Sequence, residues 1–221
     1  KAEQVVTQIL NEGGAAVAVS YDLVSAGEKV VSKAMKEYDG LHIVVCNTEQ
    51  VDSCKFEDLT EEQFKAVLWT QAVGHIELLR AAWAPFYGKR YGRIVFLAND
   101  AAYYGAPGQA HHSIAKGALV GLGQILAMEG YKYNIVSNMI SVGPTSEQEP
   151  EPAVATVAYL CCEECKPKAG IFRVEKGHVT SLRWQRDEAF VDVDKSLGDS
   201  ALDSCTEQWP MPARFQKVDY P

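Results

Sequence analysis

The sequence predicts an α/β fold built on a doubly wound parallel sheet. Short apolar runs of strand length alternate along the chain with longer segments of helical periodicity. This alternation is typical of a parallel sheet whose two faces are covered by helices. The 221 residues, 47% of them hydrophobic and 23% charged, also have the size and composition of one globular domain with a sizeable core.

The first part of the chain is predicted to hold two helices and two strands. Residues 1–12 have amphipathic spacing and precede Gly13-Gly14, which favours a helix that ends there. Residues 15–20 are predicted to form a short strand, and residues 25–38 a helix. Residues 41–46 are nearly all apolar, as expected of a parallel strand that is covered on both faces. The residues of the second helix expected to face inward are Val30, Val31, Met35 and Tyr38.

The middle of the chain is predicted to form a helix, a strand and a second helix. Thr60 and Gln63 have the spacing of a capping box, so a helix is expected from there to about Phe86. Residues 92–98 are predicted to be a buried strand, and residues 109–130 a long helix that carries a stripe of small residues. The stripe consists of Ala110, Ala115, Gly117, Ala118 and Gly121.

The predicted alternation of strands and helices continues in the last part of the chain up to Arg186 and is not recognisable beyond it. Residues 134–141 are predicted to be a strand, 151–162 a helix and 170–174 the final strand. After Arg186 the pattern weakens into a polar tail, with isolated apolar anchors. These anchors are Phe190, Trp209 and Phe215. We therefore expect one domain over residues 1–186 and a tail, 187–221, that packs on the domain or on a partner.

Charge and composition exclude several classes of function. The net charge of −8 argues against nucleic-acid binding, because phosphate recognition needs a surplus of Lys and Arg. No apolar run approaches the ~20 residues that cross a bilayer, so no membrane span is expected. Cys161, Cys162 and Cys165 form the one cysteine cluster, and no second Cys/His pair lies at zinc-finger spacing. We expect reduced thiols, an intracellular location and no metal site.

The most informative segment is a strand followed by a helix. Residues 93–98 lead into Asn99, and the next helix contains His112-Ser113-Ile114-Ala115-Lys116. This segment resembles the catalytic segment of the short-chain dehydrogenase/reductase family, in which a serine is followed by Tyr-x-x-x-Lys. The lysine is kept as Lys116, whereas His112 stands at the tyrosine position and Asn99, thirteen residues earlier, at the serine position.

Further segments extend the resemblance over most of the chain. They are similar to the 3-hydroxyacyl-CoA dehydrogenase modules of the peroxisomal multifunctional β-oxidation enzymes, which use NAD. The similar segments are GGAAV from Gly13, LLRAAW from Leu78, YGRIV from Tyr91, EGYKYNI from Glu129 and LRWQR from Leu182. The resemblance implies a Rossmann-like sheet with the order 3-2-1-4-5-6-7. Strands one and two of that order are absent from this chain, so we expect residues before Lys1, or another chain, to complete the sheet. Without them, strand 15–20 would lack a neighbour and strand 41–46 would expose an apolar edge.

The resemblance also implies roles for four positions. In the family the tyrosine takes the substrate's hydroxyl proton, the lysine lowers the tyrosine's pKa and holds the ribose, the serine orients substrate, and an asparagine supports a water relay. By position these residues are His112, Lys116, Asn99 and Gln71. Because histidine is shorter than tyrosine, we expect this proton-transfer apparatus to be dismantled. The plainer interpretation makes His112 a polar residue that fills the old cleft, Lys116 a salt-bridge or helix-surface residue, and Gln71 and Asn99 buried amides satisfied by backbone groups.

The cofactor positions depart from the family as well. The glycine-rich turn that cradles a pyrophosphate is absent from this chain, and Cys46-Asn47-Thr48-Glu49 replaces the family's Asn-Asn-Ala-Gly, which adds a carboxylate. Asp22, Asn47 and Lys116 match the remaining cofactor contacts, which we expect to be vestigial. We therefore predict no bound cofactor, with NAD as the cofactor if the module is active. The loop after Gly143 is short and acidic where relatives carry a substrate lid.

Three functions follow from these patterns. The first is a degenerate dehydrogenase-like module with an architectural or interaction role in a larger multifunctional enzyme or complex. Its partner would be an intact sister module or another protein chain, bound through helices 60–86 and 109–130. The alternative is an active NAD-dependent 3-hydroxyacyl-CoA dehydrogenase whose cofactor-binding segment precedes Lys1. A third is a non-catalytic acyl-CoA or nucleotide sensor. The resemblance implies a peroxisomal location, and a mitochondrial one is the alternative.

Overall fold

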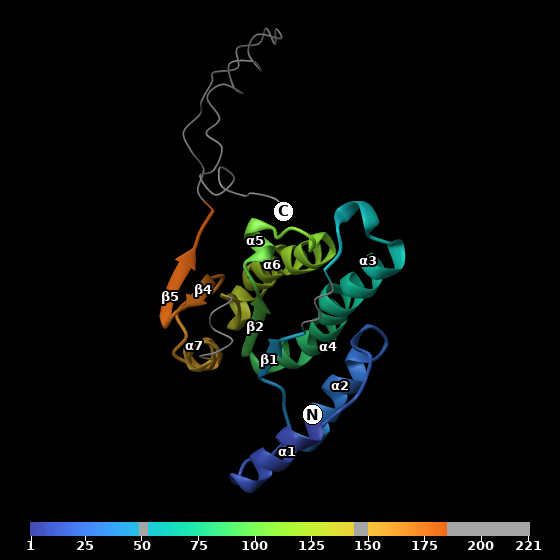
Figure 1. Cartoon of the computed structure of the whole chain (residues 1–221). Helices are drawn as coiled ribbons and strands as arrows, with labels where there is room; N and C mark the ends of the chain where they lie inside the picture. Colours follow the sequence, from blue (N-terminus) through green and yellow to red (C-terminus); the bar gives the residue numbers. More distant parts are fainter. Residues whose placement is uncertain (49–52, 144–149, 185–221) are drawn as a thin grey trace, which may run out of the picture. The chain divides into compact units, whose positions relative to one another are not determined.

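The computed structural model describes residues 1–48, 53–143 and 150–184, and residues 1–182 form one compact unit (Figure 1). Its sheet has five strands in the order β1-β2-β3-β4-β5. These are β1 (Ile43–Cys46), β2 (Gly92–Ala98), β3 (Ile135–Val142), β4 (Ile171–Glu175) and β5 (His178–Leu182). The first four are parallel, and β5 is antiparallel to β4. The predicted α/β fold with a parallel sheet is confirmed, with one antiparallel strand added at the edge.

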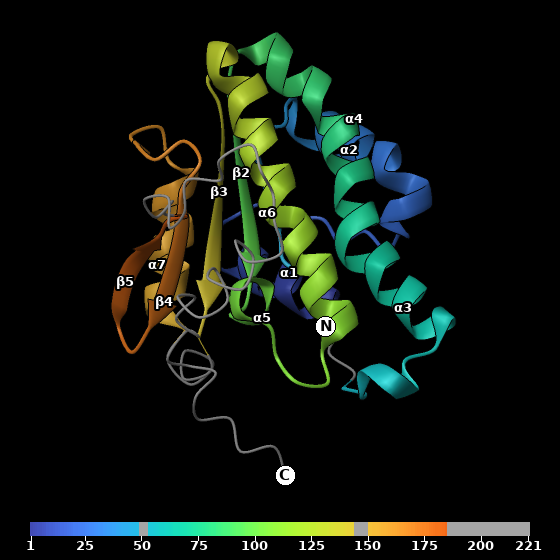
Figure 2. The same cartoon turned by 90° about the horizontal axis from the view of Figure 1, so that it is seen from above.

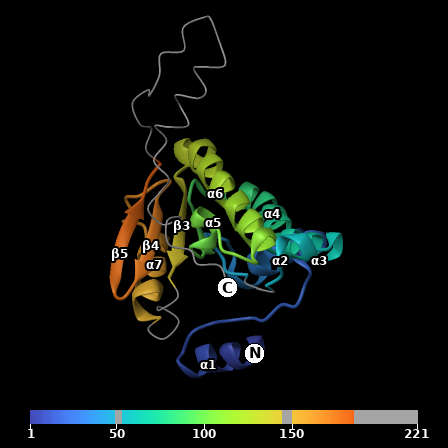
Figure 3. The same ribbon diagram turned by 45° about the horizontal axis from the view of Figure 1, so that its top comes forward.

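Helices cover both faces of this sheet, as the doubly wound arrangement requires. Helices α2, α4 and α6 lie on one face and α7 lies on the other (Figure 2). The β4–β5 hairpin lies at the end of the sheet away from α2 and α4 (Figure 3). The α-helices are α1 (Ala2–Asn11), α2 (Leu23–Tyr38), α3 (Glu61–Leu68), α4 (Gly74–Lys89), α5 (Ala101–Tyr104), α6 (Ala110–Gly130) and α7 (Glu151–Cys161). Three further turns are η1 (Phe56–Asp58), the π-helical η2 (Trp69–Val73) and η3 (Tyr131–Tyr133).

The core is divided by the sheet into two layers. The larger layer lies between the sheet and helices α2, α4 and α6, and Phe86, Phe96 and Leu119 are fully buried in it. The smaller layer packs α7 through Leu160 against β2 and β3. Helices α2 and α4 approach closely at Gly27, where an added Cβ would lie 2.9 Å from the main chain of α4. A larger residue at this position would force the two helices apart.

Local signals in the sequence predicted most element boundaries. The capping box is present, because Thr60 Oγ1 accepts a hydrogen bond from the Gln63 main-chain N–H and the Gln63 side chain accepts one from the Thr60 N–H. The helix that it begins continues through α3, η2 and α4 to Lys89, slightly beyond the predicted end. Strand β2 has the predicted bounds, and α6 and α7 begin and end within one residue of the predicted positions.

Three predictions for the first part of the chain were wrong. Residues 15–20 are not a strand, because no segment in the described part of the chain pairs with their main chain, and Val17 and Val19 are exposed. Strand β1 is not covered on both faces, since its exposed residues Ile43 and Val45 alternate with buried ones. Tyr38, expected to face inward, is exposed at the last turn of α2.

Several predictions concern residues outside the described part of the chain. These are the carboxylate of Glu49, the acidic loop that follows Gly143, and the tail with its anchors Phe190, Trp209 and Phe215. The division into residues 1–186 and 187–221 therefore stays a prediction. The structure adds one element that was not predicted: β5 pairs with β4 across a tight turn in which Lys176 and Gly177 both have positive φ, as two-residue hairpins require.

Candidate functional site

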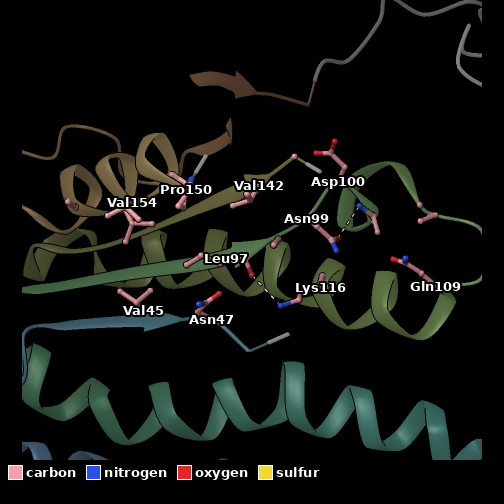
Figure 4. Close-up of a pocket in the computed structure, with 18 residues that line it drawn as sticks. Val45, Asn47, Leu97, Asn99, Asp100, Gln109, Lys116, Val142, Pro150 and Val154 are labelled. Atoms are coloured by element: carbon pink, nitrogen blue, oxygen red, sulfur yellow. Dashed lines mark hydrogen bonds between the residues drawn. The ribbon is translucent and has the colours of Figure 1, made fainter. Parts of the chain in front are cut away.

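A cavity of about 770 Å3 opens where the carboxyl ends of β1, β2 and β3 face α7 (Figure 4). This edge of a parallel sheet is where α/β proteins place their ligands. Its lining is largely apolar and includes Leu97, Val142 and Val157. The polar side chains on the described lining are Asn47, Asn99, Asp100, Gln109 and Lys116. The candidate residues Asn47, Asn99 and Lys116 thus meet at one cavity, whereas His112, Gln71 and Asp22 are not among the lining residues.

Asn99 stands between the cavity and His112. The Asn99 carboxamide Oδ1 accepts a hydrogen bond from the Ala101 main-chain N–H at the start of α5. Its Nδ2 lies 3.0 Å from the Nε2 atom of His112, on the third residue of α6. His112 is fully buried. Both polar atoms of the Asn99 carboxamide therefore have a partner within the protein. Asn99 lines the cavity, whereas the imidazole of His112 lies behind it and does not.

Lys116 is buried one turn further along α6. Its side chain is 2% exposed, so the interpretation of Lys116 as a helix-surface residue was wrong. The ammonium Nζ donates to the main-chain carbonyl of Thr48, at 2.5 Å, and to that of Leu97, at 3.3 Å (Figure 4 shows the side chain directed toward β2). These contacts tie α6 to the carboxyl ends of β1 and β2. A buried ammonium loses its solvation by water, which costs several kcal/mol, so its charge depends on the hydrogen bonds to these carbonyl oxygens.

His75 was not recognised in the sequence, yet it supports the Lys116 site. Its Nδ1 lies 2.9 Å from the Gln71 carbonyl oxygen, and its Nε2 lies 3.1 Å from Thr48 Oγ1. A carbonyl oxygen can only accept, so Nδ1 carries the proton and Nε2 accepts from the Thr48 hydroxyl. Burial lowers the pKa of His75 to about 4, with a further lowering by the charge of Lys116, against the raising effect of the Gln71 hydrogen bond. His75 is therefore neutral at physiological pH and fixes Thr48.

Gln71 lies in the π-helical turn η2 and is fully buried. The π-turn shifts the helix register between α3 and α4, and such turns are frequent near functional sites. Its main-chain carbonyl oxygen accepts a hydrogen bond from the Nδ1–H of His75, so this position contributes to the site through its backbone. The resemblance placed Gln71 at the family's asparagine position, and nothing in the sequence indicated this backbone role.

A second polar cluster lies at the rim of the cavity and was also not predicted from the sequence. Arg173 on β4 forms a two-pronged ion pair with Asp100, and Ser141 on β3 donates to the same carboxylate at 2.9 Å. Glu175 contacts the other side of the Arg173 guanidinium. Burial opposes the charged form of Asp100, but the hydrogen bonds from Arg173 and Ser141 outweigh it and hold the pKa of this carboxyl below its ordinary value. The cluster joins the carboxyl ends of β2, β3 and β4.

The described lining of the cavity offers few charged groups to the diphosphate of a dinucleotide. Lys116 is the one cation on the described lining of the cavity, and its ammonium is engaged by two carbonyl groups. Asp22 caps α2, where its carboxylate accepts from the Val24 N–H and the Ser25 hydroxyl, and it does not line the cavity. Asn47 does line it but carries no charge. No cation in this set is placed to neutralise two phosphates.

None of the helices in the described part of the chain is both long and apolar enough to cross a membrane. Within the same residues, no group of three or more His, Cys, Asp or Glu side chains is arranged to hold a metal ion.

Comparison with known proteins gives this fold and site a family context. The family model described as short chain dehydrogenase matches residues 1–153. The peroxisomal hydratase-dehydrogenase-epimerase of Neurospora crassa is 32% identical over the whole of this chain, which covers 26% of that protein. The peroxisomal multifunctional enzyme type 2 of Mus musculus is 34% identical over 84% of this chain and 27% of its own length. The chain thus spans about a quarter of the length of these two relatives.

Solved structures agree with the sequence relatives. The full-length peroxisomal multifunctional enzyme type 2 of Drosophila melanogaster matches with a TM-score of 0.81 and 25% identity, over 93% of this chain and 38% of that one. A short chain dehydrogenase from Mycobacterium avium matches with a TM-score of 0.85 at 24% identity, over 94% of this chain and 80% of that one, and supports the fold. The parallel sheet, the strand–Asn99–α6 segment and the family match together show that this chain belongs to the short-chain dehydrogenase family.

Proposed function

We propose that this chain is a dehydrogenase-fold module without the family's proton transfer, with an architectural and interaction role in a larger multifunctional enzyme. The observation that carries this proposal is the burial of His112 behind Asn99. A general base must lie within hydrogen-bond reach of the proton that it takes, either directly or through one water molecule. His112 is fully buried, does not line the cavity, and directs Nε2 at the Asn99 amide.

The position of Lys116 supports the same proposal. In the family's mechanism the lysine acts on the neighbouring tyrosine and on a ribose, whereas the tyrosine position here is occupied by His112. Here Nζ donates to the carbonyls of Thr48 and Leu97, and the Thr48 hydroxyl is held in turn by His75. Lys116 in this arrangement ties α6 to the sheet, which is a structural role.

The test is a titration with NAD of the polypeptide that carries this chain, purified free of the intact sister module, followed by an assay for NADH formation with a 3-hydroxyacyl-CoA substrate. We expect neither saturable NAD binding nor NADH formation above the rate without protein. The competing function, an active NAD-dependent 3-hydroxyacyl-CoA dehydrogenase, is favoured by the retention of Lys116 beside the cavity.

A matched pair of variants separates the two functions if turnover is detected. In an active enzyme His112→Ala would lower kcat by at least ~100-fold, the usual contribution of a general base. The control variant His111→Ala would keep most of the parental kcat. His111 is equally buried and lies next to His112, so it controls for effects on folding. Turnover with that pattern of loss would refute the architectural role.

The outer face of α3, η2 and α6 is the surface that we propose for a partner. It exposes several large apolar side chains, which an interface between helices would cover. These side chains are Trp69, Ile114, Ile125 and Met128. The predicted small-residue stripe contributes Ala118 and Gly121 to this face, whereas Ala115 is buried against the core. An intact sister module, presenting its own equivalent helices, is the partner that we propose.

Gly121→Arg tests this surface, because nothing lies within 4 Å of a Cβ added at Gly121 and the fold can accept the change. We expect the variant to abolish association of the full-length protein with itself or with its sister module in sedimentation velocity, since an arginine blocks close helix packing. Ala155→Arg, at an exposed position on α7, should associate like the parent protein. A parent protein that sediments as a monomer with and without the sister module would contradict the proposal.

The similarity to proteins named as peroxisomal supports a peroxisomal location for this chain. The names of the relatives give no support to the mitochondrial alternative.

A further inference from the structure

We propose that Cys162 and Cys165 form a thiol–disulfide exchange site, at which a low-molecular-weight disulfide of the glutathione type converts the two thiols into an intramolecular disulfide. The two cysteines enclose the sequence Cys-Glu-Glu-Cys at the end of α7. Both are free thiols in the structure, which is the starting state of this reaction. The inference goes beyond the architectural role and does not depend on whether the module is active.

This segment lies away from the cavity. Arg93, at the start of β2, contacts it, whereas the cavity opens at the carboxyl ends of the strands. Neither Cys162 nor Cys165 is among the described lining residues of the cavity. The exchange site is therefore separate from the candidate functional site.

The main chain brings the two cysteines within reach of one another. The Cys165 N–H donates to the carbonyl oxygen of Cys162 at 3.4 Å, which closes a four-residue turn. The Cα atoms of the first and fourth residues of such a turn lie less than about 7 Å apart. A disulfide joins Cα atoms that are about 4.4 to 6.8 Å apart. The bond can therefore form by rotation of side chains within the existing turn.

Both side chains face the smaller layer of the core. Cys165 is 8% exposed and belongs to this layer, and the half-buried Cys162 packs against it. The Cys162 thiol donates to the carbonyl oxygen of Tyr159 at 2.9 Å. Cys165 Sγ lies 3.7 Å from the Asn138 amide that donates to it and 3.5 Å from the carbonyl oxygen of Pro167. Thiols are weak hydrogen-bonding groups, so neither side chain is strongly held in its present rotamer.

Cys161 is the competing thiol, and its position makes it the poorer partner. It is the last residue of α7 and directly precedes Cys162. Adjacent Cα atoms lie about 3.8 Å apart, which is shorter than the separation that an ordinary disulfide spans. No turn hydrogen bond joins the main chain of Cys161 to that of Cys165 in the described part of the chain. The geometry therefore selects the pair of Cys162 and Cys165.

The difference in burial sets the order of the steps. Burial raises the pKa of the Cys165 thiol, against the charge of Arg93 and the Asn138 hydrogen bond, which lower it. A buried thiol with a raised pKa reacts slowly with a disulfide in solution. Cys162 is more exposed, so it is the thiol that meets the small disulfide first.

The exchange proceeds in two steps that balance. The Cys162 thiolate attacks one sulfur of oxidised glutathione, which forms a mixed disulfide and releases one glutathione thiolate. The Cys165 thiolate then attacks the Cys162 sulfur and expels the second glutathione thiolate. The two protein thiols lose two electrons and two protons, and oxidised glutathione takes these up to become two molecules of reduced glutathione. Cys165 can act in the second step because it is held next to the mixed disulfide.

Arg93 and Tyr91 hold the turn in the conformation that this reaction needs. Arg93 donates to the carbonyl oxygens of Cys162, at 3.1 Å, and of Glu163, at 3.4 Å. The Tyr91 hydroxyl donates to the carbonyl oxygen of Cys161 at 3.4 Å. All three acceptors are main-chain atoms, so the formation of a side-chain disulfide leaves these contacts in place. We therefore expect the fold to be the same before and after oxidation.

Mass spectrometry tests the proposal on the polypeptide that carries this chain, after incubation in a mixture of reduced and oxidised glutathione. We expect the peptide that contains residues 161–165 to lose the mass of two hydrogen atoms, with the bond mapped between Cys162 and Cys165. Addition of excess reduced glutathione should restore the free thiols. A peptide that keeps all its thiols in the folded parent protein would overturn the proposal, as would a bond mapped to Cys161.

Three serine variants assign the steps. Cys165→Ser removes the second nucleophile, so a glutathionyl group should remain on Cys162. Cys162→Ser leaves only the buried thiol of the pair, which should take up glutathione at least ~10-fold more slowly than Cys162 does in the first variant. Cys161→Ser is the matched control and should form the disulfide like the parent protein. Equal rates at Cys162 and Cys165 would refute the proposed order, and loss of the disulfide in Cys161→Ser would refute the pair. Because the readout is the mass of the protein, its outcome is separate from that of the NADH assay.

Discussion

Replacement of Arg93 by methionine is expected to lower the free energy of unfolding by about 3 kcal/mol. Arg93 is 2% exposed at the start of β2 and donates to main-chain carbonyl oxygens of three segments. These acceptors are the carbonyls of Gly92, Asn134, Cys162 and Glu163. Methionine fills a similar volume but leaves these buried acceptors without a donor. The loss should appear as a lower midpoint of urea denaturation.

Two further variants show whether the guanidinium is the cause. Arg93→Lys keeps the charge but not the planar fork that reaches several acceptors at once, so its loss should be intermediate. Arg80→Met removes an exposed arginine that pairs with Glu77 on α4, and it should change stability by no more than ~0.5 kcal/mol. An Arg93→Met protein that unfolds at the parental urea concentration would show that water replaces the lost donor.

The stability of the protein is expected to rise with pH between about 4 and 6.5 because of His75. Its pKa is about 4 in the folded state and has the ordinary value of 6.5 when the chain is unfolded. Between these values the unfolded chain binds more protons than the folded one, so acid favours unfolding. The full difference amounts to about 3 kcal/mol for one group, present above pH 6.5 and lost as the pH falls toward 4.

Urea denaturation at half-unit pH steps measures this dependence, and His75→Asn is the comparison. Asparagine does not titrate and keeps one donor and one acceptor, so the curve of the variant should be flatter by up to about 3 kcal/mol across the same interval. Parallel curves for the two proteins would mean that His75 is already solvated in the folded state, contrary to its 1% exposure.

The elements that were predicted correctly are those whose signals are local. The hydrogen bonds of the capping box join Thr60 to Gln63, three residues apart, so this pair defines the start of α3 without help from the rest of the molecule. Strand β2 was recognised because nearly all of its residues are buried, which makes its apolar run continuous.

The elements that were missed depend on partners. Residues 15–20 have the composition of a strand, but a strand exists through hydrogen bonds to a neighbour, and the described chain provides none there. Strand β5 lacks an apolar run because four of its five residues are exposed. Its pairing with β4 is set by the turn at Lys176-Gly177, where both residues have positive φ.

By itself, the sequence determined the alternation of helices and strands, the family, and the substitution of His112 and Asn99 at the positions that carry the family's chemistry. Only the tertiary structure decided what these side chains do. His112 and Lys116 lie one turn apart on α6, yet Lys116 lines the cavity and His112 does not. Two of the contacts that hold the site join residues far apart in the chain, 68 residues for Lys116 and Thr48 and 73 for Arg173 and Asp100. No local pattern encodes such contacts, because they form only when separate strands end at the same edge of the sheet.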